Sequence, residues 1–248
     1  MKQYTKKYGQ VFLRDANIRR IEVELLAPLP GEEIVEIGPG EGYLTEKLLE
    51  SGAHVTCVES DHRFVDYLSA RFHQYLAQGN LELIHGNFLE TEIGKCSKVI
   101  GNIPYHISSP ILEKLAGITF GSGVLMVQEE FARRMVAVAG DDTYSRLSVF
   151  TYLHFNARIE KIVSRNCFVP KPEVRSAIVS LKPLDRTRQL PLEFIDEKLR
   201  NLFSSKRKKI EKSIPGTAYG EMRIDQIDPE KIMDIIEFTY RNQKTGSS

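Results

Sequence analysis

The sequence predicts an α/β fold, in which an open and largely parallel sheet alternates with helices and a small helical domain follows. Two observations support this prediction. An apolar strand pattern at residues 34–37 runs straight into the turn Gly38-Pro39-Gly40-Glu41-Gly42, and a helical pattern begins at Tyr43. Strand and helix patterns then alternate from Gly31 to Gln128. Strand, glycine turn and helix in this order open the nucleotide-binding units of doubly wound sheets.

The glycine turn and an acid after the next strand predict an adenosine-containing cofactor. The strand pattern at residues 54–59 ends in Glu59, the position at which such folds bind both ribose hydroxyls. The third glycine comes one residue earlier than in the dinucleotide fingerprint G-x-G-x-x-G. Glu36 and Glu41 flank the turn, and two acids suit a cationic ligand better than a pyrophosphate. The pattern favours S-adenosylmethionine over a nicotinamide dinucleotide, and a purely structural turn remains the alternative.

The composition limits the class of protein. With 248 residues, of which 42% are hydrophobic, the chain can form one domain with an appendage, or two domains. A formal charge of +1 means that any nucleic-acid binding depends on local basic patches. Cys57, Cys96 and Cys167 are scattered and lack metal-ligand spacing. Since no signal peptide and no membrane-spanning apolar run are present, we expect a cytoplasmic protein without metal or membrane segment.

The N-terminal arm is basic, and Asp15 is the only acid among its first 20 residues. The stretch Gly9-Gln10-Val11-Phe12-Leu13 places an apolar group within this polar arm. The arm is either a solvated tail with one hydrophobic anchor or a segment that folds over the cofactor. In the second interpretation, its basic residues remain available for phosphates. A predicted helix over residues 18–26 follows the arm.

Later strand patterns end in polar or glycine-rich stretches. The patterns at residues 81–85, 98–100 and 124–127 run into residues 86–89, 101–105 and 128–130. Because open parallel sheets bind ligands beyond the carboxyl ends of their strands, we expect these stretches to line a site. Asp61 is the predicted N-cap of an intervening helix. Two further runs, at residues 155–163 and 177–181, are consistent with a pair of antiparallel edge strands.

The pattern changes after Pro183, where a polar connection leads to short helical segments. Asp228 followed by Pro229 marks a helix start, because proline is favoured at the first helical position. We predict two domains: residues 1–184 form the α/β domain with its basic arm, and residues 185–248 form a small helical RNA-binding domain.

The stretch Asn102-Ile103-Pro104-Tyr105 has the composition of a site that methylates a nucleobase amine. The lone pair of adenine N6 is delocalised into the ring, so the nitrogen is planar and weakly nucleophilic. An Asn oxygen and a backbone carbonyl just after it can accept its hydrogens and draw it towards a tetrahedral shape. Pro104 restricts that turn, and Tyr105 can stack on the base for about 1–3 kcal/mol. A structural Asn-x-Pro turn is the alternative interpretation.

These motifs resemble those of the small-subunit ribosomal RNA adenine N6,N6-dimethyltransferase family. The resemblance is collinear over nearly the whole chain, and its sister group comprises large-subunit methylases. It includes residues 9–13, 35–42, 102–105, Tyr144-Ser145-Arg146-Leu147-Ser148-Val149, Phe168-Val169-Pro170-Lys171-Pro172 and a basic helix at residues 203–209. It implies a Rossmann-like S-adenosylmethionine-dependent methyltransferase sheet. The implied reaction is N6-dimethylation of two adjacent adenosines in a hairpin loop near the 3′ end of small-subunit rRNA, during small-subunit biogenesis.

The resemblance also implies roles for individual residues. The implied catalytic and base-binding residues are Asn102, Pro104, Tyr105 and Phe168. The implied cofactor-binding residues are Gln10, Phe12, Leu13, Gly38, Gly40, Glu59, Asn87, Phe88 and Asn102. The implied RNA-binding residues are Lys6, Lys7, Lys171, Lys206, Arg207, Lys208 and Lys209. The implied partners are small-subunit rRNA and the immature small ribosomal subunit, which the chain would bind as a monomer.

Two positions depart from the family pattern, and two rival functions remain. Asn87 stands where the family commonly has Asp, which predicts weaker cofactor binding, and Val11 stands where relatives often have Asn. A nicotinamide dehydrogenase is the first rival, but it leaves Asn102 and Tyr105 unexplained. The second is a non-catalytic rRNA-binding assembly factor on the same fold. The intact turn, Glu59 and Asn102 argue against this second rival.

Overall fold

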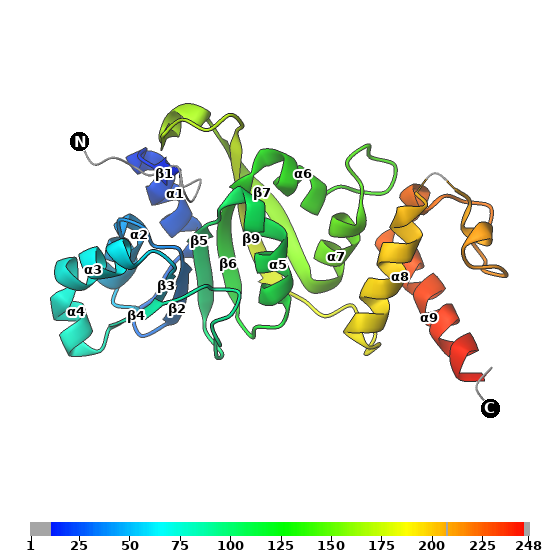
Figure 1. Ribbon diagram of the computed structural model, residues 1–248, viewed down its shortest axis with the longest axis horizontal. Helices are drawn as coiled ribbons and strands as arrows, with labels where there is room; N and C mark the ends of the chain where they lie inside the picture. The colour runs from blue at the N-terminus through cyan, green and yellow to red at the C-terminus, as the bar shows by residue number, and fades with distance from the viewer. Residues whose placement is uncertain (1–10, 207, 246–248) are drawn as a thin grey trace. The chain divides into compact units, whose positions relative to one another are not determined.

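The computed structural model describes residues 11–206 and 208–245, whose helices and strands are shown in Figure 1. By their packing, the described residues divide into two compact units. The first contains the residues up to 132 together with 158–183, and the second contains 133–157 together with the residues from 184 onward. Each unit has a hydrophobic core of its own.

A sheet of seven strands, counted over the described residues, has the order β4-β3-β2-β5-β6-β9-β7. The pairs formed among β2 to β6 are parallel, whereas β9 is antiparallel to β6. Helices connect the parallel strands, so the predicted α/β class is confirmed. The two runs predicted as edge strands are the neighbours β7 and β9, and β7 lies at the edge of the described sheet while β9 lies between β6 and β7. The strands are β2 (Glu33–Ile37), β3 (His54–Glu59), β4 (Leu81–His85), β5 (Lys98–Asn102), β6 (Ser122–Gln128), β7 (Phe155–Val163) and β9 (Ser176–Pro183).

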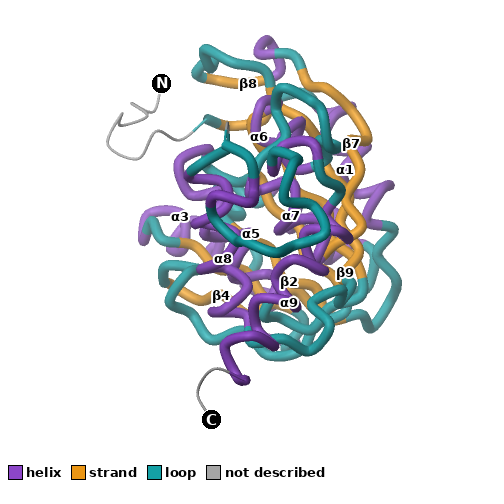
Figure 2. The backbone as a smooth tube through the Cα atoms, turned by 90° about the vertical axis from the view of Figure 1, so that its right-hand side faces the viewer, coloured by secondary structure: helices purple, strands orange, loops and turns teal. Residues whose placement is uncertain are grey.

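The helices that accompany these strands can be followed along the tube in Figure 2. The carboxylate of Asp15 accepts hydrogen bonds from the backbone N–H groups of Asn17 and Ile18, so α1 begins two residues before its predicted start. Asp61 caps α3, as predicted, by accepting from the N–H of Arg63. The elements are α1 (Ala16–Leu26), α2 (Tyr43–Glu50), α3 (His62–Arg71), α4 (His73–Gln78), η2 (Tyr105–Ile107), α5 (Ser108–Ala116), α6 (Glu129–Met135) and η3 (Arg165–Cys167).

One face of the sheet is covered by α1 and α2. Because side chains alternate between the two faces of a strand, Ile34 and Glu36 of β2 share this face with Ile100 and Asn102 of β5. The apolar members of this face pack in one cluster with residues of both helices, namely Ile18, Leu26, Leu44 and Leu48. Glu36 and Asn102 are therefore polar groups at a mainly apolar helix–sheet interface.

A second, two-stranded sheet joins distant parts of the first unit. Phe12 and Leu13 form β1 (Phe12–Leu13), which pairs antiparallel with β8 (Phe168–Val169). The Phe12 ring also lies 5.5 Å from the ring of Phe64 on α3. The apolar end of the N-terminal arm is thus anchored to the body of the unit, and the arm's basic residues Lys6 and Lys7 lie outside the described residues.

The second unit is helical. Tyr144 is fully buried, and its hydroxyl donates to the carbonyl oxygen of Ile227 at 2.8 Å. Residues 133–157 belong to this unit because Tyr144, Val149 and Leu153 share a core with the C-terminal helices. The predicted domain division at residues 184 and 185 remains a prediction. The elements are α7 (Arg146–His154), α8 (Leu192–Ser204), η4 (Ile210–Lys212), η5 (Ile224–Gln226) and α9 (Pro229–Thr245), which begins at Pro229 as predicted.

Of the basic helix predicted at residues 203–209, Phe203 and Ser204 are helical, whereas the described Lys206, Lys208 and Lys209 lie outside the helix and Arg207 is not described. Helix α8 ends at Ser204, because its buried stripe of Ile195, Leu199 and Leu202 ends before the lysines. The described basic residues follow α8 without helical structure. The backbone of Lys209 forms an isolated antiparallel β-bridge with that of Arg223. Among residues 11–206 and 208–245, no helix has the length and hydropathy needed to cross a bilayer.

Candidate functional site

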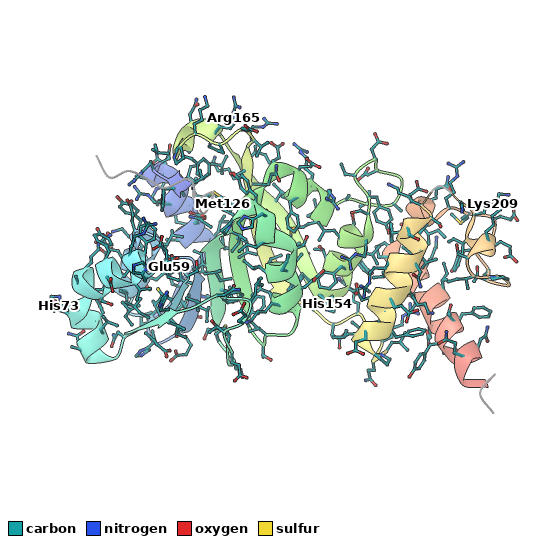
Figure 3. The ribbon with its side chains drawn as sticks, in the orientation of Figure 1. Glu59, His73, Met126, His154, Arg165 and Lys209 are labelled. Carbon is teal, nitrogen blue, oxygen red and sulfur yellow. The ribbon has the colours of Figure 1, made fainter. Side chains whose placement is uncertain are left out.

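A pocket in the first unit opens at the carboxyl ends of the parallel strands. Its walls come from the residues that follow β2, β3, β4 and β5, and from β1 and β8. Figure 3 labels two of its residues, Glu59 on β3 and Met126 on β6. Predicted site residues that line this pocket are Phe12, Leu13, Gly38, Gly40, Glu59, Asn87, Phe88, Asn102, Pro104, Tyr105 and Phe168.

The other predicted residues do not line this pocket or cannot be placed. Gln10, Lys6, Lys7 and Arg207 lie outside the described residues. Lys171 is exposed in the first unit, in the segment between β8 and β9. Lys206, Lys208 and Lys209 belong to the second unit. The structure therefore groups the described members of the predicted cofactor and base-binding sets, and the RNA-binding set remains a prediction.

The glycine turn has the backbone that its sequence predicts. Gly38, Gly40 and Gly42 have φ angles of +67°, +55° and +75°, a region that other residues rarely adopt. A Cβ on Gly42 would lie 2.5 Å from Leu68 and 2.7 Å from Phe72 of the neighbouring helix region. The early third glycine is thus required by packing against α3, whereas Gly38 and Gly40 face the pocket.

Glu59 is held in place by the backbone around it. Its side chain accepts hydrogen bonds from the N–H of Gly40 at 3.1 Å and from the N–H of Asp61 at 3.0 Å. Burial raises the pKa of this carboxyl, and the backbone donors of Asp61 and Gly40 act in the opposite direction. Since each carboxylate oxygen can accept a second hydrogen bond, Glu59 retains acceptor capacity towards the pocket.

The two acids that flank the glycine turn are compensated locally. Glu36 is buried and accepts a 2.6 Å hydrogen bond from Thr45, and burial raises its pKa to about 7. Glu41 forms an ion pair with Arg14 at 2.6 Å. The sequence predicts a cationic ligand because two acids flank the turn. The structure weakens that argument, since one acid has a raised pKa and the other is paired with an arginine.

Asn87 is exposed at the pocket rim, and its side chain is engaged within its own loop. Its Oδ1 accepts from the N–H of Leu89 at 3.1 Å, and its Nδ2 donates to Glu90 at 2.9 Å. An Asp at this position would face the Glu90 carboxylate without a proton to donate. The Asn therefore fits this loop, and its Oδ1 can accept one further hydrogen bond from a ligand.

The stretch from Asn102 to Tyr105 combines a buried acceptor with an aromatic ring. Asn102 ends β5, and its Oδ1 is buried without a hydrogen-bond partner among the described residues. The next residue, Ile103, donates its N–H to the carbonyl of Met126 at 2.9 Å, which fixes the backbone here. The hydroxyl of Tyr105 lies 2.8 Å from Oγ of Ser176, and this contact orients its ring.

Phe168 and Tyr105 line the same pocket from different elements. Phe168 belongs to β8, is only 6% exposed and packs in the main core cluster. Tyr105 begins η2 and is partly exposed. Both rings are thus available to one ligand, and the predicted sandwiching of a base between them remains a prediction.

Three residues of this region were not found from the sequence. Ser176 orients Tyr105 from β9, and Arg19 stacks on Tyr43 with its guanidinium carbon 4.0 Å from the ring centroid. Glu22 is fully buried on α1 and lies close to Asn102. One signal was present for Glu22, because it interrupts the apolar i, i+4 stripe of α1. The described residues include no metal-binding group of three or more His, Cys, Asp or Glu side chains.

The chain is similar to known proteins over most of its length. A family model described as "Ribosomal RNA adenine dimethylase" matches residues 1–239. A relative from Methanothermobacter thermautotrophicus, a probable ribosomal RNA small subunit methyltransferase A, is 36% identical over 98% of this chain and 93% of its own length. A relative of the same name from Thermococcus sibiricus is 35% identical over 95% of this chain and 84% of its own length.

A solved structure extends the similarity to the fold. The crystal structure of a dimethyladenosine transferase from Plasmodium falciparum is similar to this chain with a TM-score of 0.84 and 28% sequence identity. The similarity covers 93% of this chain and 98% of that structure. The predicted resemblance, fold class and enzyme class are confirmed by these comparisons. The chain belongs to the ribosomal RNA adenine dimethylase family.

Proposed function

We propose that this enzyme uses S-adenosylmethionine to dimethylate N6 of two adjacent adenosines in a hairpin loop near the 3′ end of small-subunit rRNA. The proposed setting is the cytoplasm, where the chain acts as a monomer on an immature small ribosomal subunit. The observation that carries the proposal is the buried Oδ1 of Asn102, an acceptor without a described partner in the pocket that also holds Glu59. Such an atom fits a substrate amine, because an unpaired buried acceptor is otherwise costly.

The alternative of a non-catalytic rRNA-binding factor is not favoured. The relatives are named as methyltransferases, and the similar solved structure is a dimethyladenosine transferase. This chain also keeps Glu59 and Asn102, and both line the pocket. A factor without activity has no use for an amide acceptor at the pocket floor.

The pocket residues fit the proposed cofactor. Gly38 and Gly40 expose backbone at the pocket, where the positive φ angles exclude most side chains. Glu59 would hold the two ribose hydroxyls through its remaining acceptor capacity. Phe88 and Asn87 would flank the adenine, since both line the pocket after β4. When bound, the cofactor supplies an electrophilic methyl group on a positively charged sulfur.

The chain's own residues would prepare the target amine. Asn102 Oδ1 would accept one N6 hydrogen, and a backbone carbonyl of the following turn would accept the other. These two acceptors favour a tetrahedral nitrogen, whose lone pair is then free to attack. They interact more strongly with the transition state than with the planar ground state, which is the requirement for catalysis. Tyr105 and Phe168 would hold the base between their rings.

The test of this function is a methylation assay. Immature small subunits are incubated with cofactor that carries a radiolabelled methyl group, and the rRNA is digested and separated into nucleosides. We expect labelled N6,N6-dimethyladenosine at two adjacent positions of one hairpin loop. Label confined to other nucleosides, or rRNA binding without label, would contradict the proposal.

Tyr105 gives a prediction that separates base stacking from local structure. Tyr105→Ala should weaken target-RNA binding by about 1–3 kcal/mol, because a base loses its stacking partner. Tyr105→Phe should retain this binding, since it removes only the hydroxyl that contacts Ser176. Filter binding of the hairpin RNA measures both variants, and Ser176→Ala is the matched control for the lost hydroxyl contact. Equal losses in Tyr105→Phe and Tyr105→Ala would argue against stacking.

The basic run gives a prediction about salt dependence. Each phosphate contact contributes about −0.9 to the slope of log affinity against log salt for duplex and about −0.7 for single strands. Replacing Arg207, Lys208 and Lys209 with Gln should therefore flatten the slope by roughly two to three units. Lys206 is retained because its Nζ donates to the carbonyl of Tyr144 at 2.9 Å. Titrations of hairpin RNA at several salt concentrations provide the measurement.

The control for the basic run is Glu221→Gln. Glu221 forms an ion pair with Lys209, so its neutralisation leaves Lys209 more available to phosphate. This variant should steepen the salt slope or leave it unchanged, while the triple variant flattens it. A slope unaffected by the triple substitution would assign the run to the solvated surface.

A further inference from the structure

Arg19 is a cation in the wall of the pocket. Among the described residues that line the pocket, it is the one with a positively charged side chain, whereas Glu36, Glu41 and Glu59 supply carboxyl groups. Arg19 lies on α1, next to the buried Ile18, and is itself partly buried. A single cation in a pocket that otherwise carries acids indicates a ligand with a negatively charged group on this side.

Two contacts hold the guanidinium of Arg19 in place. Its Cζ lies 4.0 Å from the centre of the Tyr43 ring, and its Nη2 donates to the carbonyl oxygen of Arg14 at 3.2 Å. The Tyr43 ring is also fixed, because its hydroxyl accepts from Nη1 of Arg14 at 3.1 Å. A guanidinium has five N–H donors, so these contacts leave most of them for a ligand. Because the side chain is ordered beforehand, it loses little entropy on binding.

The charge of Arg19 is not neutralised by a neighbouring acid. No carboxylate of the described residues forms an ion pair with it. Glu41, at the glycine turn, is paired with Arg14 instead. Glu22 on α1 interacts with Arg19 electrostatically, but burial raises the pKa of Glu22 to about 8, so this group is mainly protonated at neutral pH. The charge of Arg19 is therefore available to an anion in the pocket.

The proposed cofactor contacts leave one anionic group of S-adenosylmethionine without a partner. They would place the adenine after β4, the ribose after β3 and the reactive methyl group at Asn102, which ends β5. Strand β2 lies between β3 and β5, and the glycine turn follows it. The amino-acid part branches from the sulfur and would extend over this turn. Tyr43 comes directly after the turn, so the guanidinium stacked on its ring lies on the same side.

We propose that Arg19 binds the α-carboxylate of the cofactor's methionine part and makes the pocket selective for adenosyl ligands that keep this group. The inference rests on the proposed use of S-adenosylmethionine. A guanidinium matches a carboxylate with two parallel N–H···O bonds, and such charge-assisted bonds are stronger than neutral ones. Arg19 would thus discriminate against decarboxylated forms, whose adenine and ribose are the same. The contact involves neither the transferred methyl group nor the target base, so its effect is on binding.

Calorimetry without RNA tests the proposal. The two ligands are S-adenosylhomocysteine and its decarboxylated analogue, in which a hydrogen atom replaces the carboxylate. The parent should bind the first about 10- to 100-fold more tightly, as expected for hydrogen bonds between charged groups. Arg19→Met should lose a similar factor for S-adenosylhomocysteine, while it binds the analogue no more weakly than the parent does. Methionine keeps a long, unbranched side chain beside the Tyr43 ring.

Two further variants serve as controls. Arg19→Lys keeps the charge but lacks the planar fork of donors, so it should recover only part of the lost affinity. Arg20→Met is the matched control, because Arg20 is the next residue of α1 but is exposed and paired with Glu24. This control should bind both ligands within about twofold of the parent.

The outcomes separate this inference from its rivals. Equal losses for both ligands in Arg19→Met, or no loss for S-adenosylhomocysteine, would overturn it, because Arg19 would then only form the wall. A parent that binds both ligands equally overturns it even if Arg19→Met does not fold. Weaker binding of hairpin RNA with unchanged cofactor affinity would also overturn it, by assigning Arg19 to an RNA phosphate. If the parent methylates no rRNA but keeps the expected ligand preference, and Arg19→Met loses it, the proposed function fails while this inference stands.

Discussion

Asn102→Ala should reduce kcat by about 10²–10³-fold, the usual loss on removing one preorganised group that stabilises a transition state. The reason is geometric. Oδ1 of Asn102 is buried at the end of β5 without a described partner, and its backbone neighbour is fixed by the bond from Ile103 to Met126. The backbone that carries this acceptor is therefore fixed before the target nitrogen becomes tetrahedral. Single-turnover methylation of hairpin RNA at saturating cofactor measures the loss.

The control for this prediction is a second asparagine in the same pocket. Asn87 lines the rim, and its side chain bonds to Leu89 and Glu90 within its own loop. Asn87→Ala should weaken cofactor binding and leave kcat at saturation close to the parent value. Asn102→Ala should lower kcat and leave cofactor binding close to that of the parent. Normal single-turnover methylation in Asn102→Ala, together with weakened RNA binding, would show that the residue only helps to bind the substrate.

The fold could be predicted because its main signals are local. The strand before Gly38, the turn itself and the helix from Tyr43 occupy one short stretch, and all three are observed. Glu59 could be placed at the carboxyl end of the sheet because it ends the next strand, β3. Strands β1 and β8 were missed because each has only two residues, which is too short for an alternating pattern.

Features that depend on distant partners were predicted less well. Residues 133–157 pack with the C-terminal helices through a core that joins Tyr144 to Ile227 and Ile232, and no local pattern indicates this. The predicted basic helix ends at Ser204, and the described Lys206, Lys208 and Lys209 are not helical, because a run of lysines carries no apolar stripe to hold it against a core. A run of charged residues indicates that a segment is exposed to solvent. Whether its backbone is helical depends on apolar contacts that the run does not contain.

The charges around the pocket show the same limit. Glu36 and Glu41 look alike in the sequence, yet burial raises the pKa of Glu36 against the opposing hydrogen bond from Thr45, while Glu41 is paired with Arg14. Glu22 could have been noticed as a polar residue within an apolar stripe, but only the packing of α1 against the sheet places it near Asn102. Sequence patterns thus predict which residues reach the pocket better than they predict the charge that each carries there.

Glu59→Ala should weaken S-adenosylmethionine binding by about 1–3 kcal/mol, the contribution of hydrogen bonds to a charged group. In the folded chain this carboxyl also accepts from the N–H groups of Gly40 and Asp61, so the substitution removes support from the glycine turn as well. Glu59→Gln has a related defect, because its amide N–H₂ must face one of these two backbone donors. Loss of affinity alone therefore does not show that Glu59 contacts the ribose.

A double-mutant cycle, in which one change is made in the protein and the other in the ligand, distinguishes the two roles of Glu59. Calorimetry compares the parent and Glu59→Ala, each with S-adenosylhomocysteine and with its 2′-deoxy analogue. If Glu59 binds the ribose hydroxyls, the missing hydroxyl should cost the parent about 1–2 kcal/mol and cost Glu59→Ala almost nothing, which gives a coupling energy of similar size. If Glu59 only supports the turn, both proteins should lose the same amount and the coupling should vanish. That result would leave the ribose without its proposed partner and would make Glu59 a purely structural acid, held by Gly40 and Asp61.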